Sequence, residues 1–138
     1  MVQEIRSHNN LQLFFGANEL VCKHCGEGEL SEDFASILQR VRGTYGRAMI
    51  VTSCCRCVQH NKNEGGHARS LHVFGDSYWP TGGTAAMDIV MPNNADLYHL
   101  VKALQNVDCS IGFNRPKGFL HFDIRSRYTD RPPIIWDY

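Results

Sequence analysis

The sequence lacks several features, and each absence excludes a class of protein. No apolar run approaches the roughly 18 residues that a membrane-spanning helix needs. The formal net charge is zero, with 14 basic and 14 acidic residues, so the chain lacks the basic excess that binds nucleic-acid phosphates. Internal repeats and low-complexity linkers are also missing. We therefore expect neither a membrane nor a nucleic acid as partner.

The first residues, Met1 to Arg6, lack the charged and apolar regions of a secretory signal peptide. We therefore expect cytoplasmic synthesis without a signal peptide. The chain has 138 residues, of which 43% are hydrophobic and 20% are charged, and a chain of this size can bury its own core. The sequence predicts a single folded domain over residues 1–138, acting as a monomer.

The apolar periodicity predicts an α+β fold. Apolar residues at helical spacing predict helices at Ser31–Tyr45, with Ser31 as N-cap, and at Asn94–Val107. Alternating apolar residues and turn signals predict strands at residues 48–53, 85–91, 110–114 and 119–125. The segment 54–80 is predicted to be a long functional loop with a short helix near 59–64. The tail after Arg131 is predicted to be irregular.

Three short segments together make a candidate metal site. The segments are Ser70–Gly75, Ala85–Ile89 and Phe119–Asp123. They supply the imidazoles of His72 and His121 and the carboxylate of Asp88. Three protein ligands, with a fourth position open for water, are typical of a catalytic zinc rather than a structural one. The sequence therefore predicts one Zn²⁺ bound by His72, Asp88 and His121.

Strand alternation indicates where the neighbouring side chains point. Successive residues of a strand face opposite sides of the sheet. In the predicted strand 119–125, Leu120 and Phe122 lie on the core face, so His121, Asp123 and Arg125 point together away from the core. Asp123 is therefore the candidate catalytic base. The alternative is that Asp123 is an outer partner that orients a ligand imidazole.

These segments resemble the zinc D-Ala-D-Ala carboxypeptidase family, in particular its small peptidoglycan peptidases from phages and bacteria. The matching segments follow one another in the order Ile50–Ser53, Arg56–Asn61, Gly65–His72, Ala86–Ile89, Phe119–Arg125 and Arg127–Trp136. The resemblance extends over residues 34–136. It implies a fold of the hedgehog/DD-peptidase type, in which a central antiparallel sheet has helices packed on one face and zinc on the other.

The resemblance also implies a function. It implies a zinc-dependent peptidase that cleaves peptidoglycan stem peptides, as a D,D-carboxypeptidase or an L-Ala–D-Glu endopeptidase, with Arg56 and Ser70 binding the substrate. A phage endolysin acting at the cell wall fits the missing signal peptide. The family often has an acid shortly before its last zinc histidine, but Gly118 and Phe119 stand there in this chain. A catalytically inactive relative that binds zinc or peptidoglycan is therefore an alternative.

The spacing of the ligands departs from the family pattern. His72 and Asp88 are sixteen residues apart, which is farther than is usual in the family. We interpret the extra residues as a surface-loop insertion, because longer loops cost little free energy. Asp76, four residues after His72, is then a rival for Asp88 as metal ligand.

The six cysteines raise a separate question. Cys22–Cys25 and Cys54–Cys57 are both C-x-x-C pairs, and two such pairs are a signature of structural zinc. Free thiols are the main alternative, since the missing signal peptide argues against a disulfide. A Cys-rich zinc module that binds protein or nucleic acid is a further alternative function. Cys109 is predicted to pack in the core.

Overall fold

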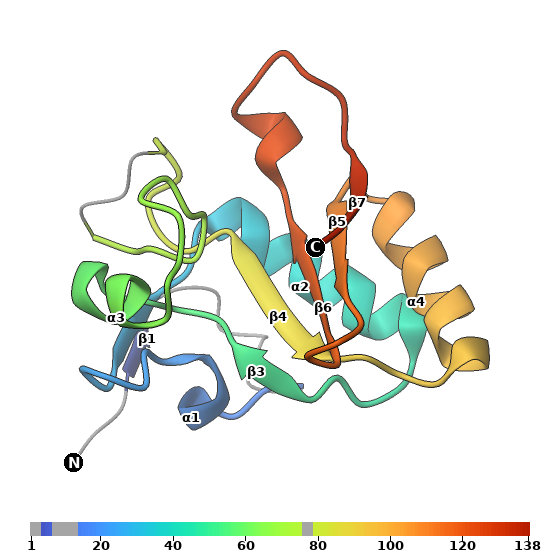
Figure 1. Cartoon of the computed structure of the whole chain (residues 1–138), viewed down its shortest axis with the longest axis horizontal. Helices are drawn as coiled ribbons and strands as arrows, with labels where there is room; N and C mark the ends of the chain where they lie inside the picture. The colour runs from blue at the N-terminus through green and yellow to red at the C-terminus, as the bar shows by residue number, and fades with distance from the viewer. Residues whose placement is uncertain (1–3, 7–13, 76–78) are drawn as a thin grey trace.

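The computed structural model describes residues 4–6, 14–75 and 79–138. The chain folds around a five-stranded sheet with the strand order β3-β4-β6-β5-β7 (Figure 1). Its strands are β3 (Val51–Ser53), β4 (Ala86–Val90), β5 (Ser110–Asn114), β6 (Phe119–Asp123) and β7 (Ile135–Asp137). Neighbouring strands run antiparallel except β5 and β7, which are parallel. The predicted α+β class with a largely antiparallel sheet is confirmed.

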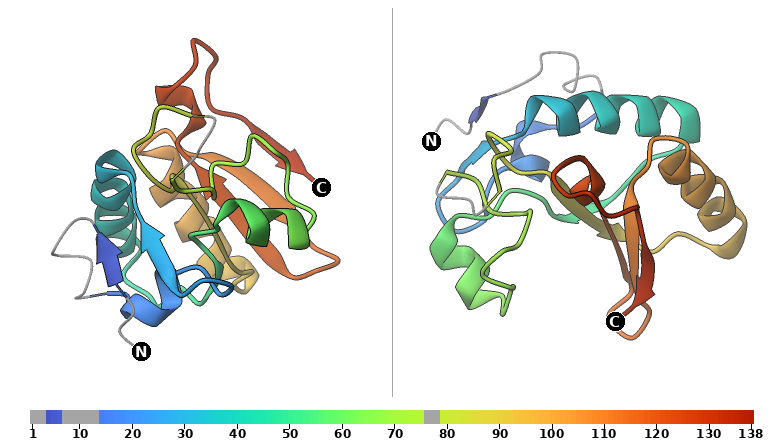
Figure 2. Two further views of the ribbon diagram at one scale, coloured as in Figure 1. Left: turned by 90° about the vertical axis from the view of Figure 1, so that its left-hand side faces the viewer. Right: turned by 90° about the horizontal axis from the view of Figure 1, so that it is seen from above.

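Two long helices lie on one side of this sheet (Figure 2). The first is α2 (Glu32–Tyr45), and Ser31 caps it as predicted by accepting a hydrogen bond from the Phe34 N–H at 3.3 Å. The second is α4 (Asn94–Gln105), which is capped by Asn93. Phe34 of α2 packs on Phe122 of β6 with 5.9 Å between the ring centroids. The core therefore lies between the helices and the face of the sheet that carries Phe122.

Shorter elements surround the sheet. They are β1 (Glu4–Arg6), α1 (Ala17–Leu20), β2 (Glu27–Glu29), α3 (Val58–Asn63) and the 3₁₀ turn η2 (Arg125–Arg127). Strands β1 and β2 form a separate parallel pair. Helix α3 confirms the predicted short helix, and it lies across the sheet from α2 (Figure 2). None of the helices in the described part of the chain combines the length and the apolar character that a bilayer span requires.

The prediction of an irregular tail was wrong, because β7 extends the sheet in parallel with β5. Gly112 of β5 is paired with Trp136 of β7, and the indole lies so close that a Cβ on Gly112 would come within 2.5 Å of it. The missing side chain of Gly112 thus leaves the space that the Trp136 ring occupies. Apolar alternation alone does not reveal such a short edge strand, because only Trp136 of its three residues is partly buried.

Two predicted strands lose two or three residues at one end in the structure. The first begins at Val51 rather than Ala48. The hairpin strand β6 ends at Asp123, because the chain then turns into η2, where the Arg127 N–H bonds the Ile124 carbonyl at 3.0 Å. Arg125 therefore reaches back toward Asp123 from a turn instead of continuing the strand.

Candidate metal centre

The three predicted ligands come from two adjacent strands and one loop. Strands β4 and β6 pair in a register that sets Asp88 directly opposite His121, so their side chains share one face of the sheet. His72 reaches them from the loop after α3. Its carbonyl accepts hydrogen bonds from the Arg56 N–H at 2.9 Å and from the Thr84 hydroxyl at 2.7 Å. This loop is thus fixed at the position from which His72 extends.

These ligands form a compact buried group. One ligand atom from each of His72, Asp88 and His121 lies within 4.8 Å of the others. Asp88 Oδ1 is 3.2 Å from His72 Nε2 and 2.9 Å from His121 Nδ1. The exposed fractions of the three residues are 2%, 5% and 7% in chain order. The rival ligand Asp76 lies outside the described residues.

The outer nitrogen of each imidazole already has a hydrogen-bond acceptor. His72 Nδ1 lies 2.7 Å from the Cys54 carbonyl oxygen, and His121 Nε2 lies 2.7 Å from Asp123 Oδ2. A carbonyl and a carboxylate only accept, so we assign the proton of each neutral ring to this outer nitrogen. The inner nitrogens then direct lone pairs at Asp88 Oδ1. Three acceptor atoms converge in a buried space, and a cation between them would remove their repulsion.

The charge states of two of the three ligands fit a metal ion. Burial lowers the pKa of His72, although the Asp88 carboxylate opposes the effect, so this ring favours its neutral, metal-binding form. Burial alone would raise the pKa of Asp88, but His72 and His121 outweigh it and hold the carboxyl ionised. For the third, His121, burial would lower the pKa, but hydrogen bonds to Asp123 and Asp88 raise it. Two imidazoles and a carboxylate are ligands that Zn²⁺ commonly takes. The donor set therefore fits Zn²⁺.

Asp123 faces His121 on the side away from Asp88. It is fully buried, and Arg125 holds it through the backbone N–H at 2.9 Å, Nε at 3.0 Å and Nη2 at 2.7 Å. Burial would raise the pKa of Asp123, but hydrogen bonds from His121 and Arg125 lower it to about 2. Both carboxylate oxygens are therefore occupied by cationic or N–H partners. The side chains of His121 and Asp123 point away from the helices, as alternation predicts, yet they are not exposed.

Aromatic side chains of the last strand and of the residue after it cover this arrangement. The ring of Trp136 lies 5.5 Å from the His121 ring and 4.5 Å from the Arg125 guanidinium carbon. Tyr138 stacks edge-on against Phe119 at 5.4 Å. Strand β7 thus shields one side of the metal group from water.

The metal group opens into a cleft of about 1210 Å³. Arg56 lies in its wall, where Nε bonds Ser53 at 2.9 Å, Nη1 bonds Asn61 at 3.3 Å and Nη2 bonds Asp88 at 3.2 Å. Ser70 also lines the cleft, but its hydroxyl accepts the His72 N–H at 3.2 Å. Both predicted substrate-binding residues are therefore beside the metal group, and each also supports one of its ligands.

Some contributors to the site carry no clear signal in the sequence. Cys54 acts through its backbone carbonyl, which every residue possesses. Thr84 and Gly83 come from the presumed surface insertion, yet Thr84 is buried, and a Cβ on Gly83 would meet the Leu30 carbonyl carbon at 2.6 Å. The end of the insertion is thus packed against the body of the protein. The pairing of Trp136 with Gly112 can be recognised only after β7 has been placed beside β5.

The cysteines do not group in the structure as the two C-x-x-C pairs group them in the sequence. Cys22, Cys25 and Cys57 form a second group that could hold a metal. Cys54 is absent from that group, because it is buried with its Sγ 3.7 Å from the Ala86 carbonyl. The structure therefore does not bring the two complete C-x-x-C pairs together, which the structural-zinc alternative would require. All six cysteines are free, and Cys109 is buried as predicted, which raises the pKa of its thiol to about 12.

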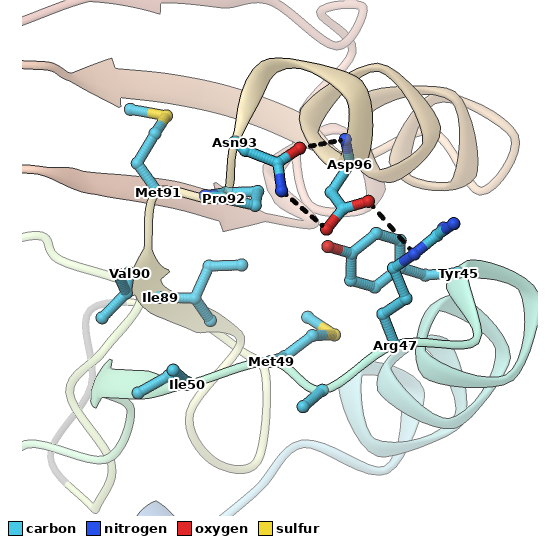
Figure 3. Close-up of a pocket in the computed structure, with 11 residues that line it drawn as sticks. Tyr45, Arg47, Met49, Ile50, Ile89, Val90, Met91, Pro92, Asn93 and Asp96 are labelled. Atoms are coloured by element: carbon cyan, nitrogen blue, oxygen red, sulfur yellow. Dashed lines mark hydrogen bonds and ion pairs between the residues drawn. The ribbon is translucent and has the colours of Figure 1, made fainter.

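A smaller pocket of about 360 Å³ lies at the other end of β4 (Figure 3). Figure 3 shows Asp96 beside Arg47 and Asn93, and the Arg47 Nε lies 3.1 Å from Asp96 Oδ1. Apolar side chains such as Met49 and Ile89 line the rest. No group of metal-binding side chains among the described residues lines this pocket.

The comparisons with known proteins identify the family. The sequence profile of the Peptidase M15 family matches residues 8–123, which include all three candidate ligands. The chain therefore belongs to the M15 peptidases, a family of metallopeptidases of the zinc D-Ala-D-Ala carboxypeptidase type. Searches of curated proteins and of solved structures gave no significant match.

Proposed function

We propose that the protein is a zinc-dependent peptidase that cleaves peptide bonds in peptidoglycan stem peptides. The bond would be the terminal D-Ala–D-Ala bond or the internal L-Ala–D-Glu bond. The observation that carries the proposal is the convergence of His72 Nε2, His121 Nδ1 and Asp88 Oδ1 beside an open cleft. Membership of the M15 family supports the same reaction class.

The charge of the cleft supports a substrate with free carboxylates. Its basic lining residues are Arg56, Arg69, Lys117, Arg125 and Arg131. Its acidic lining residues are Glu64, Asp88 and Asp123, and the last two are buried and paired with His72, His121 and Arg125. The accessible charge is therefore mainly positive. Stem peptides carry several carboxylates, and a guanidinium can bind a carboxylate through two hydrogen bonds.

The residues around the metal group take separate roles in this proposal. Zinc held by His72, Asp88 and His121 would polarise the scissile carbonyl and lower the pKa of a bound water to about 7. Arg56 orients Asp88 and lines the cleft, where it would engage the substrate. Ser70 fixes the backbone at His72 and lines the path to it. Strand β7 excludes water from the far side of His121.

Asp123 is better placed to orient His121 than to act as the base. Its Oδ2 bonds the ring nitrogen opposite the one that faces Asp88, and Arg125 occupies its remaining capacity. A carboxylate that accepts from a ligand histidine fixes the ring and raises its basicity. We therefore infer that Asp123 is a positioning residue, and that a cleft-facing group such as His67 takes the proton.

One observation favours the inactive alternative. The carboxylates that line the cleft in the described part of the chain are those of Glu64, Asp88 and Asp123, and the last two are occupied. Glu64, at the C-terminal end of α3, has its Oε1 3.4 Å from His60 Nε2, so it also has a partner. An inactive relative would bind zinc and cell-wall peptide without cutting it.

The test is to incubate the zinc-loaded protein with a synthetic stem pentapeptide and with intact peptidoglycan. We expect new amino groups, and mass spectrometry of the fragments will identify the bond. His72→Ala should lose both the zinc of this site and the activity. Asp130→Asn, an exposed acid on the segment after η2, serves as control and should change neither. Zinc binding without fragments from either substrate would support the inactive alternative.

A further inference from the structure

The three cysteines Cys22, Cys25 and Cys57 are not used by the proposed peptidase site. Their sulfur atoms all lie within 4.8 Å of one another, although Cys57 is 32 residues after Cys25 in the chain. They are free thiols. Three thiols that converge from two distant segments are a donor set for a soft metal ion.

The segment around Cys22 and Cys25 is folded as a tight turn. The Gly26 N–H bonds the Cys22 carbonyl at 2.8 Å, and the Cys22 N–H bonds the Glu27 carbonyl at 2.7 Å. Gly26 has a φ of 74°, a conformation that glycine adopts without steric cost. This turn places both thiols of the C-x-x-C pair on one side, toward Cys57.

Backbone N–H groups also surround the sulfur of Cys22. The Cys57 N–H donates to Cys22 Sγ at 3.4 Å. The backbone N–H groups of Cys25 and His24 also bond this sulfur. N–H donors stabilise a thiolate, which is the form that binds metal.

The second segment supplies its donors from the start of α3. Cys57 is the N-cap, and its Sγ accepts the His60 N–H at 3.3 Å. Cys57 and His60 are thus a C-x-x-H pair on the first turn of the helix. The His60 side chain is only 13% exposed, and its Nε2 lies 3.4 Å from Glu64 Oε1. Its ring nitrogens lie outside the group that the three sulfurs form, so the ring has to turn toward the sulfurs to offer Nδ1 to a shared ion. The exposed His24 ring stacks on His60 at 6.3 Å between the centroids.

We propose that Cys22, Cys25, Cys57 and His60 bind a second, structural Zn²⁺. Three thiolates and one imidazole close a tetrahedral site and leave no position open for water. The site would join the turn before β2 to the start of α3. Cys57 directly follows Arg56, so the ion would also hold the wall of the cleft in place. This site is independent of the peptidase activity proposed above.

The first test counts zinc in the purified protein by elemental analysis. We expect two zinc ions per chain in the wild type and one in His72→Ala, in Cys22→Ser and in Cys57→Ser. Cys109→Ala is the matched control, because Cys109 is a buried thiol that belongs to neither metal group, and it should keep both ions. The proposal would be overturned if the wild type held one zinc and Cys57→Ser retained it. It would also be overturned if Cys109→Ala lost zinc while Cys57→Ser kept both ions.

The second test does not depend on the folding of a cysteine variant. In His72→Ala, X-ray absorption at the zinc edge should give mainly sulfur neighbours at about 2.3 Å, with a nitrogen neighbour at about 2.0–2.1 Å. His60→Ala in this background should lose the nitrogen neighbour, whereas His24→Ala should keep it. Zinc without sulfur neighbours would overturn the site. The opposite result for the two histidine variants would overturn the assignment of His60.

Discussion

Asp88 is the residue on which the contacts of the candidate metal centre converge. One of its oxygens faces both His72 and His121, and the other bonds Arg56. Burial would raise the pKa of this carboxylate, but its interactions with His72 and His121 lower it, so Asp88 remains ionised. Changes at residues that touch Asp88 should therefore affect metal binding, substrate binding or both, and the two effects can be measured separately.

Arg56→Lys tests the role of the guanidinium. Lysine keeps the charge, but its single nitrogen cannot bond Ser53, Asn61 and Asp88 together as the guanidinium does. We expect turnover of stem peptides to fall by about tenfold or more, since one charge-assisted hydrogen bond contributes roughly 1.5–3 kcal/mol. Zinc content, measured on the same samples, should not change.

Arg47→Lys is the matched control for this change. Arg47 pairs with Asp96 at a half-exposed position in the smaller pocket (Figure 3). The control should leave turnover unaltered. Equal kinetics for the wild type and Arg56→Lys would place Arg56 outside the substrate site.

Asp123→Asn separates the orienting role from the role of a base. The amide cannot hold His121 and Arg125 as the carboxylate does, so the ligand ring loses its fixed orientation. We expect zinc affinity to fall by roughly 10–100-fold and excess zinc to restore much of the activity. Competition with a chelator measures the affinity, and initial rates at several zinc concentrations measure the recovery. If instead turnover falls by about 10²–10⁴-fold with zinc fully bound, Asp123 is the base.

At the scale of elements, the edge pair β5–β7 contains one unusually close side-chain contact. Gly112 lies between His121 on β6 and Trp136 on β7. Its backbone permits other residues, so the requirement for glycine here is space rather than conformation. The indole of Trp136 can take this position only because Gly112 has no Cβ. The cover that Trp136 provides over His121 and Arg125 therefore depends on this glycine.

Gly112→Ala should push the indole away from the sheet. The new Cβ would lie within 2.6 Å of two indole carbons, and overpacking of this kind costs typically about 1–3 kcal/mol. We expect a lower free energy of unfolding in urea and weaker zinc binding. Gly43→Ala is the control, because Gly43 lies in α2 with nothing within 4 Å of an added Cβ, and alanine there should raise stability by up to about 1 kcal/mol. Equal losses in both variants would contradict the role of the Trp136 contact.

Helices and central strands were predictable, because their apolar periodicity reflects the same core that they build. Ser31 and Asn93 mark the helix starts, because each side chain accepts a hydrogen bond from the backbone N–H three residues later. The strand β7 was not predictable in this way, since it is an edge strand that pairs with residues 24 positions away in the chain and buries little of its own surface. Pairing between distant segments, rather than local preference, decides such an element.

At the scale of the whole molecule, buried carboxylates link folding to pH. Asp123 has a pKa of about 2 in the folded protein against 3.8 in its ordinary state. A lowered pKa stabilises the folded state above the ordinary value, and that stabilisation is lost as the pH falls from about 3.8 through about 2. The full effect is about 2 kcal/mol.

Urea unfolding of the chelator-treated protein at neutral pH and at about pH 3 measures this loss. The wild type should lose more stability between the two conditions than Asp123→Asn, which has no carboxyl to titrate at that position. An equal loss in the two proteins would show that Asp123 does not contribute to the acid sensitivity.

The candidate site was predictable to the extent that its chemistry lies in side chains. His72, Asp88 and His121 stand in three recognisable segments, and strand register brings two of them together. The choice among the cysteines was not predictable, because spacing pairs Cys54 with Cys57 whereas their positions in the fold separate them. Cys54 contributes to the metal group through its carbonyl instead, and no residue type signals that contact.

The indole of Trp136 lies within van der Waals reach of both the His121 ring and the Arg125 guanidinium. Indole fluorescence is sensitive to nearby charge and to the protonation of a neighbouring imidazole. Titration of the apoprotein with zinc should therefore change the emission of Trp136, and Trp79→Phe would remove the signal of the other tryptophan. The last strand thus gives the protein an intrinsic optical reporter of whether its metal site is filled.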